Sequence, residues 1–108
     1  MPLKKVNIAI IGATGYTGLD LVLLLSRHPK ANIKYLCATK NLGKKISFFD
    51  KRIKKKLPKL SSLNKIDWLK IDLVFLSMPN GEAQKLIKKI YHKHTHIKFI
   101  DLSADFRI

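Results

Sequence analysis

The stretch Gly12-Ala13-Thr14-Gly15-Tyr16-Thr17-Gly18 lies between two apolar runs and decides the fold that the chain is expected to adopt. It follows the run 6–11 and leads into the leucine-rich run 19–25. A strand, a glycine-rich turn and a helix in this order are typical of a site that holds nucleotide phosphates on backbone amides. The spacing G-x-x-G-x-x-G departs from the general G-x-G-x-x-G fingerprint. The motif therefore indicates a nucleotide site without identifying it.

Strands and helices alternate along the rest of the chain. We expect strands at 5–11, 33–38, 73–78 and 98–102, a minor strand at 60–63, a helix from the glycines to Arg27 or His28, and a helix at 82–91. This order predicts the α/β class, as a single Rossmann-like domain with a doubly wound parallel sheet between two helical layers.

Two parts of this pattern need further structure. Residues 39–67 show little periodicity, with a short helical turn expected at 47–53. The helix that follows the glycines is apolar on nearly all sides, so a further segment should cover the side that faces away from the sheet. Its last turn should hold the basic residues Arg27 and His28, before Pro29.

The formal charge of +15 is the unusual feature of the composition, and the tract Lys44–Lys59 holds much of it. Such a charge suits nucleic acid, a membrane surface, or a lysine-rich proteome. Aromatic residues are not interleaved with the lysines as base stacking requires, so no nucleic-acid partner is expected. No apolar run approaches the length of a membrane span, so no membrane partner is expected either. A single cysteine, Cys37, fits a reducing cytoplasm.

The end of the second strand indicates which nicotinamide cofactor is bound. An acidic residue there would accept the ribose 2′-hydroxyl of NAD, whereas a basic residue suits the 2′-phosphate of NADP. The sequence reads Cys37-Ala38-Thr39-Lys40, and no acidic residue follows until Asp50. Thr39 and Lys40 therefore favour NADP, although a solvated basic loop would look the same.

Two further polar groups follow strands at the edge where open α/β sheets bind ligands. Pro79-Asn80-Gly81 follows the strand at 73–78 and could lie against the cofactor or simply connect a strand to a helix. Ser103, Asp105 and Arg107 follow the last strand and could bind an acidic substrate, orient a neighbouring domain, or form an ordinary polar loop.

Neither the cysteine nor the clustered histidines indicate a catalytic centre. Cys37 lies in an apolar strand with no adjacent base, so a buried and inert thiol is expected. His92, His94 and His96 lie among lysines that would repel a divalent cation, so we expect no metal site. No catalytic residue is predicted within the chain.

The motifs together resemble N-acetyl-γ-glutamyl-phosphate reductase, a family of the semialdehyde dehydrogenase group. The matching pieces are G-A-T-G-Y-T-G-L-D-L at 12–21, H-P at 28–29, D-L-V-F-L-S-M-P-N-G at 72–81 and D-L-S-A-D-F-R at 101–107. They occur in the family's order across nearly the whole chain. The Tyr16-Thr17 pair and the S-A-D-F-R ending distinguish this family from aspartate-semialdehyde dehydrogenase.

The resemblance implies NADPH-dependent reduction of an acyl phosphate to a semialdehyde in arginine biosynthesis, through a cysteine thioester. It implies that residues 1–108 are the NADP-binding domain of a longer, homo-oligomeric enzyme. The catalytic cysteine, its partner histidine and the α+β substrate domain would then lie beyond residue 108. The residues that match the family's cofactor motifs are Gly12, Thr14, Gly15, Tyr16, Thr17, Gly18, Thr39, Lys40, Pro79, Asn80 and Gly81.

Three alternatives stay open on the sequence. The chain could be a freestanding nucleotide-binding or regulatory module that uses the same glycine turn without catalysis. It could be part of an enzyme like aspartate-semialdehyde dehydrogenase. It could also bind nucleic acid through the tract Lys44–Lys59, in which case its binding would depend strongly on salt.

Overall fold

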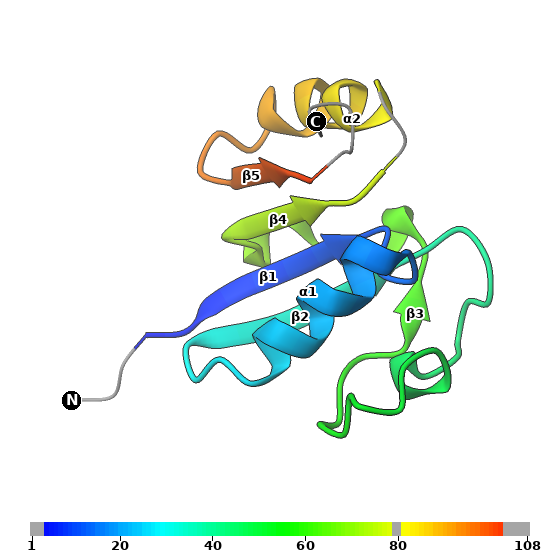
Figure 1. The fold of residues 1–108 in the computed structure, drawn as a ribbon. Coiled ribbons are helices and arrows are strands. Elements are labelled where there is room, and N and C mark those ends of the chain that lie inside the picture. The colour runs from blue at the N-terminus through cyan, green and yellow to red at the C-terminus, as the bar shows by residue number, and fades with distance from the viewer. Residues whose placement is uncertain (1–3, 79–80, 103–108) are drawn as a thin grey trace, which may run out of the picture.

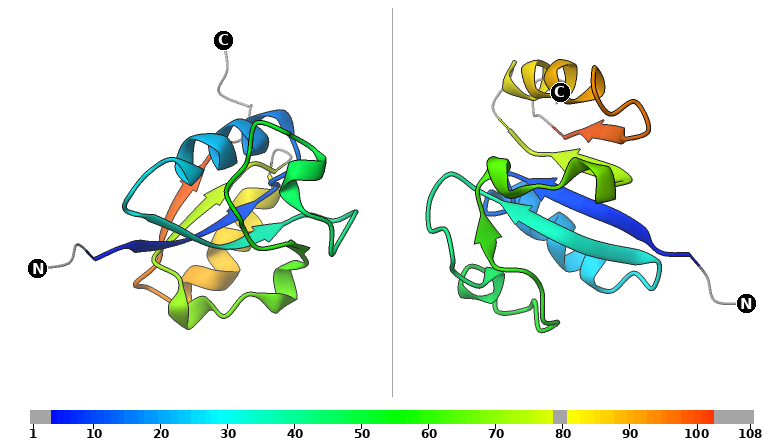
Figure 2. Two further views of the ribbon diagram at one scale, coloured as in Figure 1. Left: turned by 90° about the horizontal axis from the view of Figure 1, so that it is seen from below. Right: turned by 180° about the vertical axis from the view of Figure 1, so that it is seen from behind.

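The computed structural model describes residues 4–78 and 81–102 and shows one parallel sheet with a helix on each face (Figure 1). The strands lie in the order β3-β2-β1-β4-β5. Two crossover units, β1-α1-β2 and β4-α2-β5, place α1 and α2 on opposite faces (Figure 2). The elements are β1 (Val6–Ile11), α1 (Tyr16–Ser26), β2 (Ala31–Cys37), β3 (Leu60–Ser61), β4 (Leu73–Leu76), α2 (Glu82–Tyr91) and β5 (Lys98–Asp101). The expected Rossmann-like fold is confirmed.

Strand β1 is central because both of its faces are apolar. It pairs with β2 on one side, where Ile11 lies opposite Cys37, and with β4 on the other, where Ile11 lies opposite Leu76. Residues Ile8 to Ile11 are all at most 4% exposed. A run of buried residues without alternation is typical of a strand covered on both faces.

The core has two halves, one on each face of the sheet. Ile8 and Ile10 of β1 face α1 and pack in one cluster with Val22. Ala9 and Ile11 face the other side and pack in a second cluster with Ile90 of α2. Side chains alternate across a strand, so one six-residue strand supplies the centre of both clusters.

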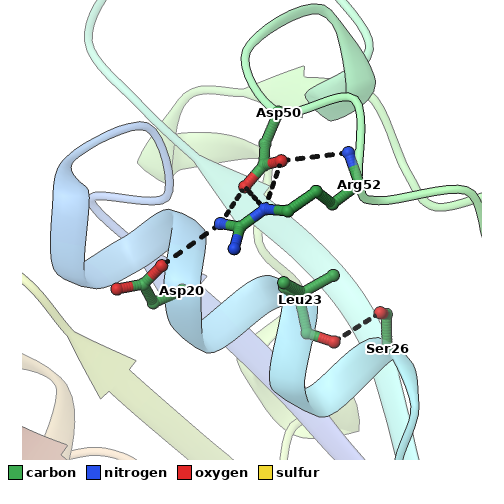
Figure 3. A network of polar contacts seen from close by, with 5 residues as sticks. All are labelled: Asp20, Leu23, Ser26, Asp50 and Arg52. Carbon is green, nitrogen blue, oxygen red and sulfur yellow. Dashed lines mark hydrogen bonds and ion pairs between the residues drawn. The ribbon is translucent and has the colours of Figure 1, made fainter.

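The irregular connection between β2 and β3 covers part of α1, as its apolar sequence requires. Ile46, in the 3₁₀ turn Ile46–Phe48, and Ile53 are buried in the same cluster as Val22. Arg52 reinforces this contact, because its Nη2 lies 2.7 Å from Asp50 Oδ2 and 3.4 Å from Asp20 Oδ1 of α1 (Figure 3). The cover is partial, since Leu24 is 69% exposed.

Most element bounds agree with the sequence-based expectation within two residues, and α2 agrees at both ends. The prediction that Arg27 and His28 lie in the last turn of α1 is wrong. The helix ends at Ser26, whose Oγ donates to the Leu23 carbonyl (Figure 3). Arg27 is its C-cap, and the Arg27 amide donates to the Leu24 carbonyl. A side chain that competes for a carbonyl in this way favours an early end to a helix. Among the described residues, no helix is long and apolar enough to cross a membrane.

Close packing within the protein is enough to exclude a side chain at two of the three glycines in the turn. A Cβ on Gly12 would lie 2.0 Å from the Ser77 carbonyl oxygen, and a Cβ on Gly18 would lie 2.1 Å from the Gly12 carbonyl oxygen. Gly12 also has φ +85°, which disfavours any side chain. Backbone atoms are therefore in direct contact where the start of α1, the end of β1 and the residue after β4 come together.

Cys37 is a core residue, as expected. Its side chain is 1% exposed, and Sγ lies 3.9 Å from the Ser62 carbonyl oxygen, to which it donates. Burial raises the pKa of Cys37 from 9.0 to about 11, against a smaller opposing hydrogen bond with Ser61. The thiol is therefore protonated, and a poor nucleophile, at neutral pH.

Gly12→Ala should lower the free energy of unfolding by about 3 kcal/mol or more, because the strained φ and the clash with Ser77 act together. Gly43→Ala is the matched control: its φ is +86°, but nothing lies within 4 Å of the added Cβ. Its cost should be only the backbone strain, about 1 kcal/mol. Urea denaturation of both variants measures the difference, and equal losses would contradict the close packing at Gly12.

Cys37 should make the fold less stable at high pH. A group whose pKa is higher in the folded than in the unfolded state contributes stability that is fully present below the unfolded pKa. This stability is lost as the pH rises through the folded pKa. The loss should therefore fall between pH 9 and about 11 and be at most about 3 kcal/mol. Comparing urea denaturation of the wild type and Cys37→Ala across this range isolates it, because lysines and tyrosines titrate in both. Parallel pH profiles would show that the folded thiol has an ordinary pKa.

Candidate cofactor site

A cleft of about 380 Å³ crosses the carboxyl ends of the central strands. Its walls come from the residues that follow β1, β2, β3 and β4, and from the first residue of α2. The strand order reverses direction between β1 and β4, because β2 and β3 continue to one side and β5 to the other. Open α/β sheets bind ligands at this position. The lining residues are Ile11, Gly12, Thr14, Cys37, Ala38, Thr39, Leu42, Ser62, Leu63, Ser77, Met78 and Glu82.

Backbone hydrogen bonds hold the glycine turn in place before any ligand arrives. The amides of Gly12 and Ala13 donate to the Cys37 carbonyl at 3.0 and 3.1 Å. The Ser77 amide donates to the Ile11 carbonyl at 2.8 Å. The ends of β1, β2 and β4 are thus joined directly beneath the cleft, so the turn is fixed by three strands.

The start of α1 offers backbone donors. Its first intrahelical bond runs from the Leu19 amide to the Gly15 carbonyl at 2.8 Å. The amides of Tyr16, Thr17 and Gly18 precede that bond, and none of them donates to a described residue. Free amides and the positive end of the helix dipole together attract an anion. This geometry suits a phosphate group.

Gly15 differs from the other two glycines of the turn. Its φ of −74° and ψ of 171° are open to any residue, and a Cβ there would only touch the Gly12 carbonyl oxygen at 3.8 Å. The fold therefore has no need for glycine at this position. A ligand that must approach the backbone closely would need it.

The predicted site residues within the described part of the chain divide into three groups. Gly12, Thr14 and Thr39 line the cleft. Gly15, Tyr16 and Thr17 lie exposed where α1 begins, with Tyr16 95% exposed, and Gly18 is buried beneath them. Lys40 is exposed next to Thr39, and Gly81, with φ +89°, directly precedes α2.

Some predicted residues lie outside the described part of the chain. These are Pro79, Asn80, Ser103, Asp105 and Arg107.

Several residues that line the cleft were not predicted from the sequence. Ser77 and Met78 belonged to an expected strand, but β4 ends at Leu76 and leaves them at its carboxyl end. Ser62 and Leu63 similarly follow the two-residue β3. The rule that ligands bind at strand ends could have found these four. Leu42 gave no such signal, because it lies in an irregular loop.

The histidine cluster forms no metal centre among the described residues, where no three suitable ligands come together. His96 Nε2 lies 3.1 Å from the Ile71 carbonyl oxygen. The rings of His94 and His96 meet edge to face with centroids 6.1 Å apart. The contact between His96 and Ile71 joins the loop after α2 to the segment before β4.

The chain is similar to curated reductases over nearly its whole length. It is 46% identical over 107 residues to the N-acetyl-gamma-glutamyl-phosphate reductase of Ehrlichia ruminantium (strain Gardel), covering 96% of this chain and 30% of that protein. It is 42% identical over 108 residues to that of Afipia carboxidovorans, covering 97% and 31%. The chain thus spans about 30% of the length of these relatives.

Solved structures share the fold at lower identity. One is an aspartate semialdehyde dehydrogenase with NADP from Candida albicans, with a TM-score of 0.69 at 23% identity, covering 96% of this chain and 31% of that one. Another is aspartate semialdehyde dehydrogenase II from Vibrio cholerae, with a TM-score of 0.69 at 24% identity, covering 96% and 30%. Both likenesses concern the fold.

A family model supplies the assignment. Residues 7–108 match the model described as semialdehyde dehydrogenase, NAD binding domain. This match includes every described element except the first residue of β1. The chain therefore belongs to the semialdehyde dehydrogenase family and carries its NAD-binding domain.

Proposed function

We propose that this chain binds NADP(H) in the cleft above β1 and is the cofactor-binding part of an N-acetyl-γ-glutamyl-phosphate reductase. The observation that carries the proposal is Gly15, whose lack of a side chain serves no packing purpose and leaves backbone open beside free helix amides. The similarity to curated reductases supports the choice of enzyme.

The cleft residues suit the successive parts of the cofactor. The turn Gly12–Gly18 would hold the pyrophosphate on its amides, and Thr39 and Lys40 would bind the 2′-phosphate. Gly81, with Pro79 and Asn80, would lie beside the nicotinamide half, as Met78 and Glu82 would. The described structure supports 2′-phosphate binding because no carboxylate follows β2 in the cleft wall.

In the proposed reaction, an acyl phosphate is reduced to a semialdehyde and inorganic phosphate is released. When bound, the nicotinamide supplies the hydride. This chain would hold and orient the cofactor, and its buried Cys37 would take no part because its thiol stays protonated. The nucleophilic cysteine, its histidine and the substrate domain are proposed to lie in the part of the enzyme that the relatives have beyond this chain's match.

The full enzyme would be a cytoplasmic homo-oligomer that acts on a small acyl phosphate, with no nucleic-acid or membrane partner in the reaction. Ser103, Asp105 and Arg107 would lie at the substrate edge. The pair Tyr16-Thr17 favours this reductase over an aspartate-semialdehyde dehydrogenase. The solved aspartate semialdehyde dehydrogenases add no support for that alternative, because their likeness extends to the fold alone.

Gly15→Val should weaken NADPH binding at least about tenfold, because the added side chain would fill the space that the pyrophosphate must enter. The free energy of unfolding should change by less than about 1 kcal/mol, since the backbone conformation suits any residue. Fluorescence titration with NADPH and urea denaturation measure the two effects. Unchanged affinity in a folded variant would exclude the assigned turn as the phosphate site.

Lys40→Ala should weaken NADPH binding about tenfold and leave NADH binding nearly unchanged, because only NADPH carries the 2′-phosphate. Lys34→Ala is the matched control, since Lys34 is also exposed but lies within β2, before the cleft. Competitive titrations of both cofactors against each variant measure the ratio. An equal loss for NADPH and NADH would assign Lys40 a role other than recognition of the 2′-phosphate.

A further inference from the structure

A larger hollow, of about 510 Å³, lies beside the edge strand β3 and is lined mainly by lysines. Its floor is apolar and belongs to the core that covers α1, through Ile46 and Ile53. Five of its nine lining residues are lysines, and no carboxylate belongs to its described wall. We call it the lysine hollow; its lysines are Lys45, Lys54, Lys55, Lys56 and Lys59.

The neighbouring acid does not neutralise this charge. Asp50 is the only acidic residue between Asp20 and Asp67 in the sequence. Arg52 binds it through Nε and Nη2 and holds the pKa of its carboxyl below the usual range (Figure 3). Among the described residues, no lysine of the hollow makes an ion pair with a carboxylate. The hollow is therefore a region of concentrated positive charge.

The lysine hollow adjoins the cofactor cleft. Lys59 lines the hollow and Ser62 lines the cleft, three residues further along an extended segment. At about 3.3 Å per residue this separates them by roughly 10 Å. The Gly43 amide donates to the Leu60 carbonyl, and the Leu60 amide donates to the Lys44 carbonyl. These hydrogen bonds fix the loop between the lysine hollow and the cofactor cleft. The separation is close to the Debye length, about 8 Å at physiological salt.

We propose that the lysine hollow accelerates the entry of NADPH into the cofactor cleft by electrostatic attraction, without contacting the bound cofactor. NADPH is a polyanion, with a pyrophosphate and a 2′-phosphate, so a positive surface beside the cleft raises its local concentration. Charges that act only during the encounter change the association rate and leave the dissociation rate alone. This inference rests on the proposed binding of NADPH.

The test is the triple variant Lys54→Glu/Lys55→Glu/Lys56→Glu. A matched control reverses three exposed lysines near the opposite ends of the strands, as Lys30→Glu/Lys93→Glu/Lys98→Glu. Each variant lowers the formal charge by six, from +15 to +9, so net charge is held equal. Stopped-flow fluorescence measures NADPH association and dissociation at about 0.01 M and about 1 M salt.

At low salt, the hollow variant should associate about tenfold more slowly than the wild type, and the control less than about twofold more slowly. Dissociation rates should be unchanged, and all three proteins should converge at high salt. Circular dichroism checks that each variant is folded. If the glutamates unfold the chain, Lys54→Gln/Lys55→Gln/Lys56→Gln should show a smaller slowing of association in the same direction.

Three results would overturn the proposal. An unchanged association rate would show that the hollow does not attract the cofactor. In that case, binding of a single-stranded oligonucleotide to the hollow would assign the lysines to nucleic acid instead. An equal slowing in the control would assign the effect to net charge. A faster dissociation with unchanged association would mean that the lysines touch bound NADPH. Failure of the wild type to bind NADPH would instead refute the proposed function.

Discussion

The contact of three backbones at Gly12 is the constraint on which the site depends. The Gly12 carbonyl leaves no room for a side chain on Gly18, and the Ser77 carbonyl leaves none on Gly12. Helix α1, strand β1 and the segment after β4 can therefore approach more closely than side chains would allow. This approach brings the amino end of α1, with its free amides, to the carboxyl end of the sheet, where Gly12 and Thr14 line the cleft.

The three glycines of the turn thus have two different roles. Gly12 and Gly18 are fixed by the packing of the protein itself, whereas the surroundings of Gly15 are open. From the sequence, each glycine could be assigned a separate role only by analogy with the general motif. The distances to a hypothetical Cβ separate the glycines that build the turn from the one that leaves space beside it.

The sequence predicted the sheet and α2 well because their signals are local. The apolar runs that became β1 and β4 and the periodicity of Ala83, Leu86, Ile87 and Ile90 needed no knowledge of distant contacts. Strand order and the contribution of Leu42 to the cleft wall depend on long-range packing and could not be predicted. The end of α1 was misplaced because the Ser26 hydroxyl competes for a helix carbonyl.

The shortness of β3 has a consequence for how molecules of this protein meet one another. An edge strand exposes unpaired amides and carbonyls that can recruit a strand from another molecule. Here the outer edge is only two residues long, and Pro58 and Lys59 directly precede it. Proline lacks an amide to donate, and lysine repels a second positively charged copy. The edge beside β2 is therefore a poor template for fibril growth.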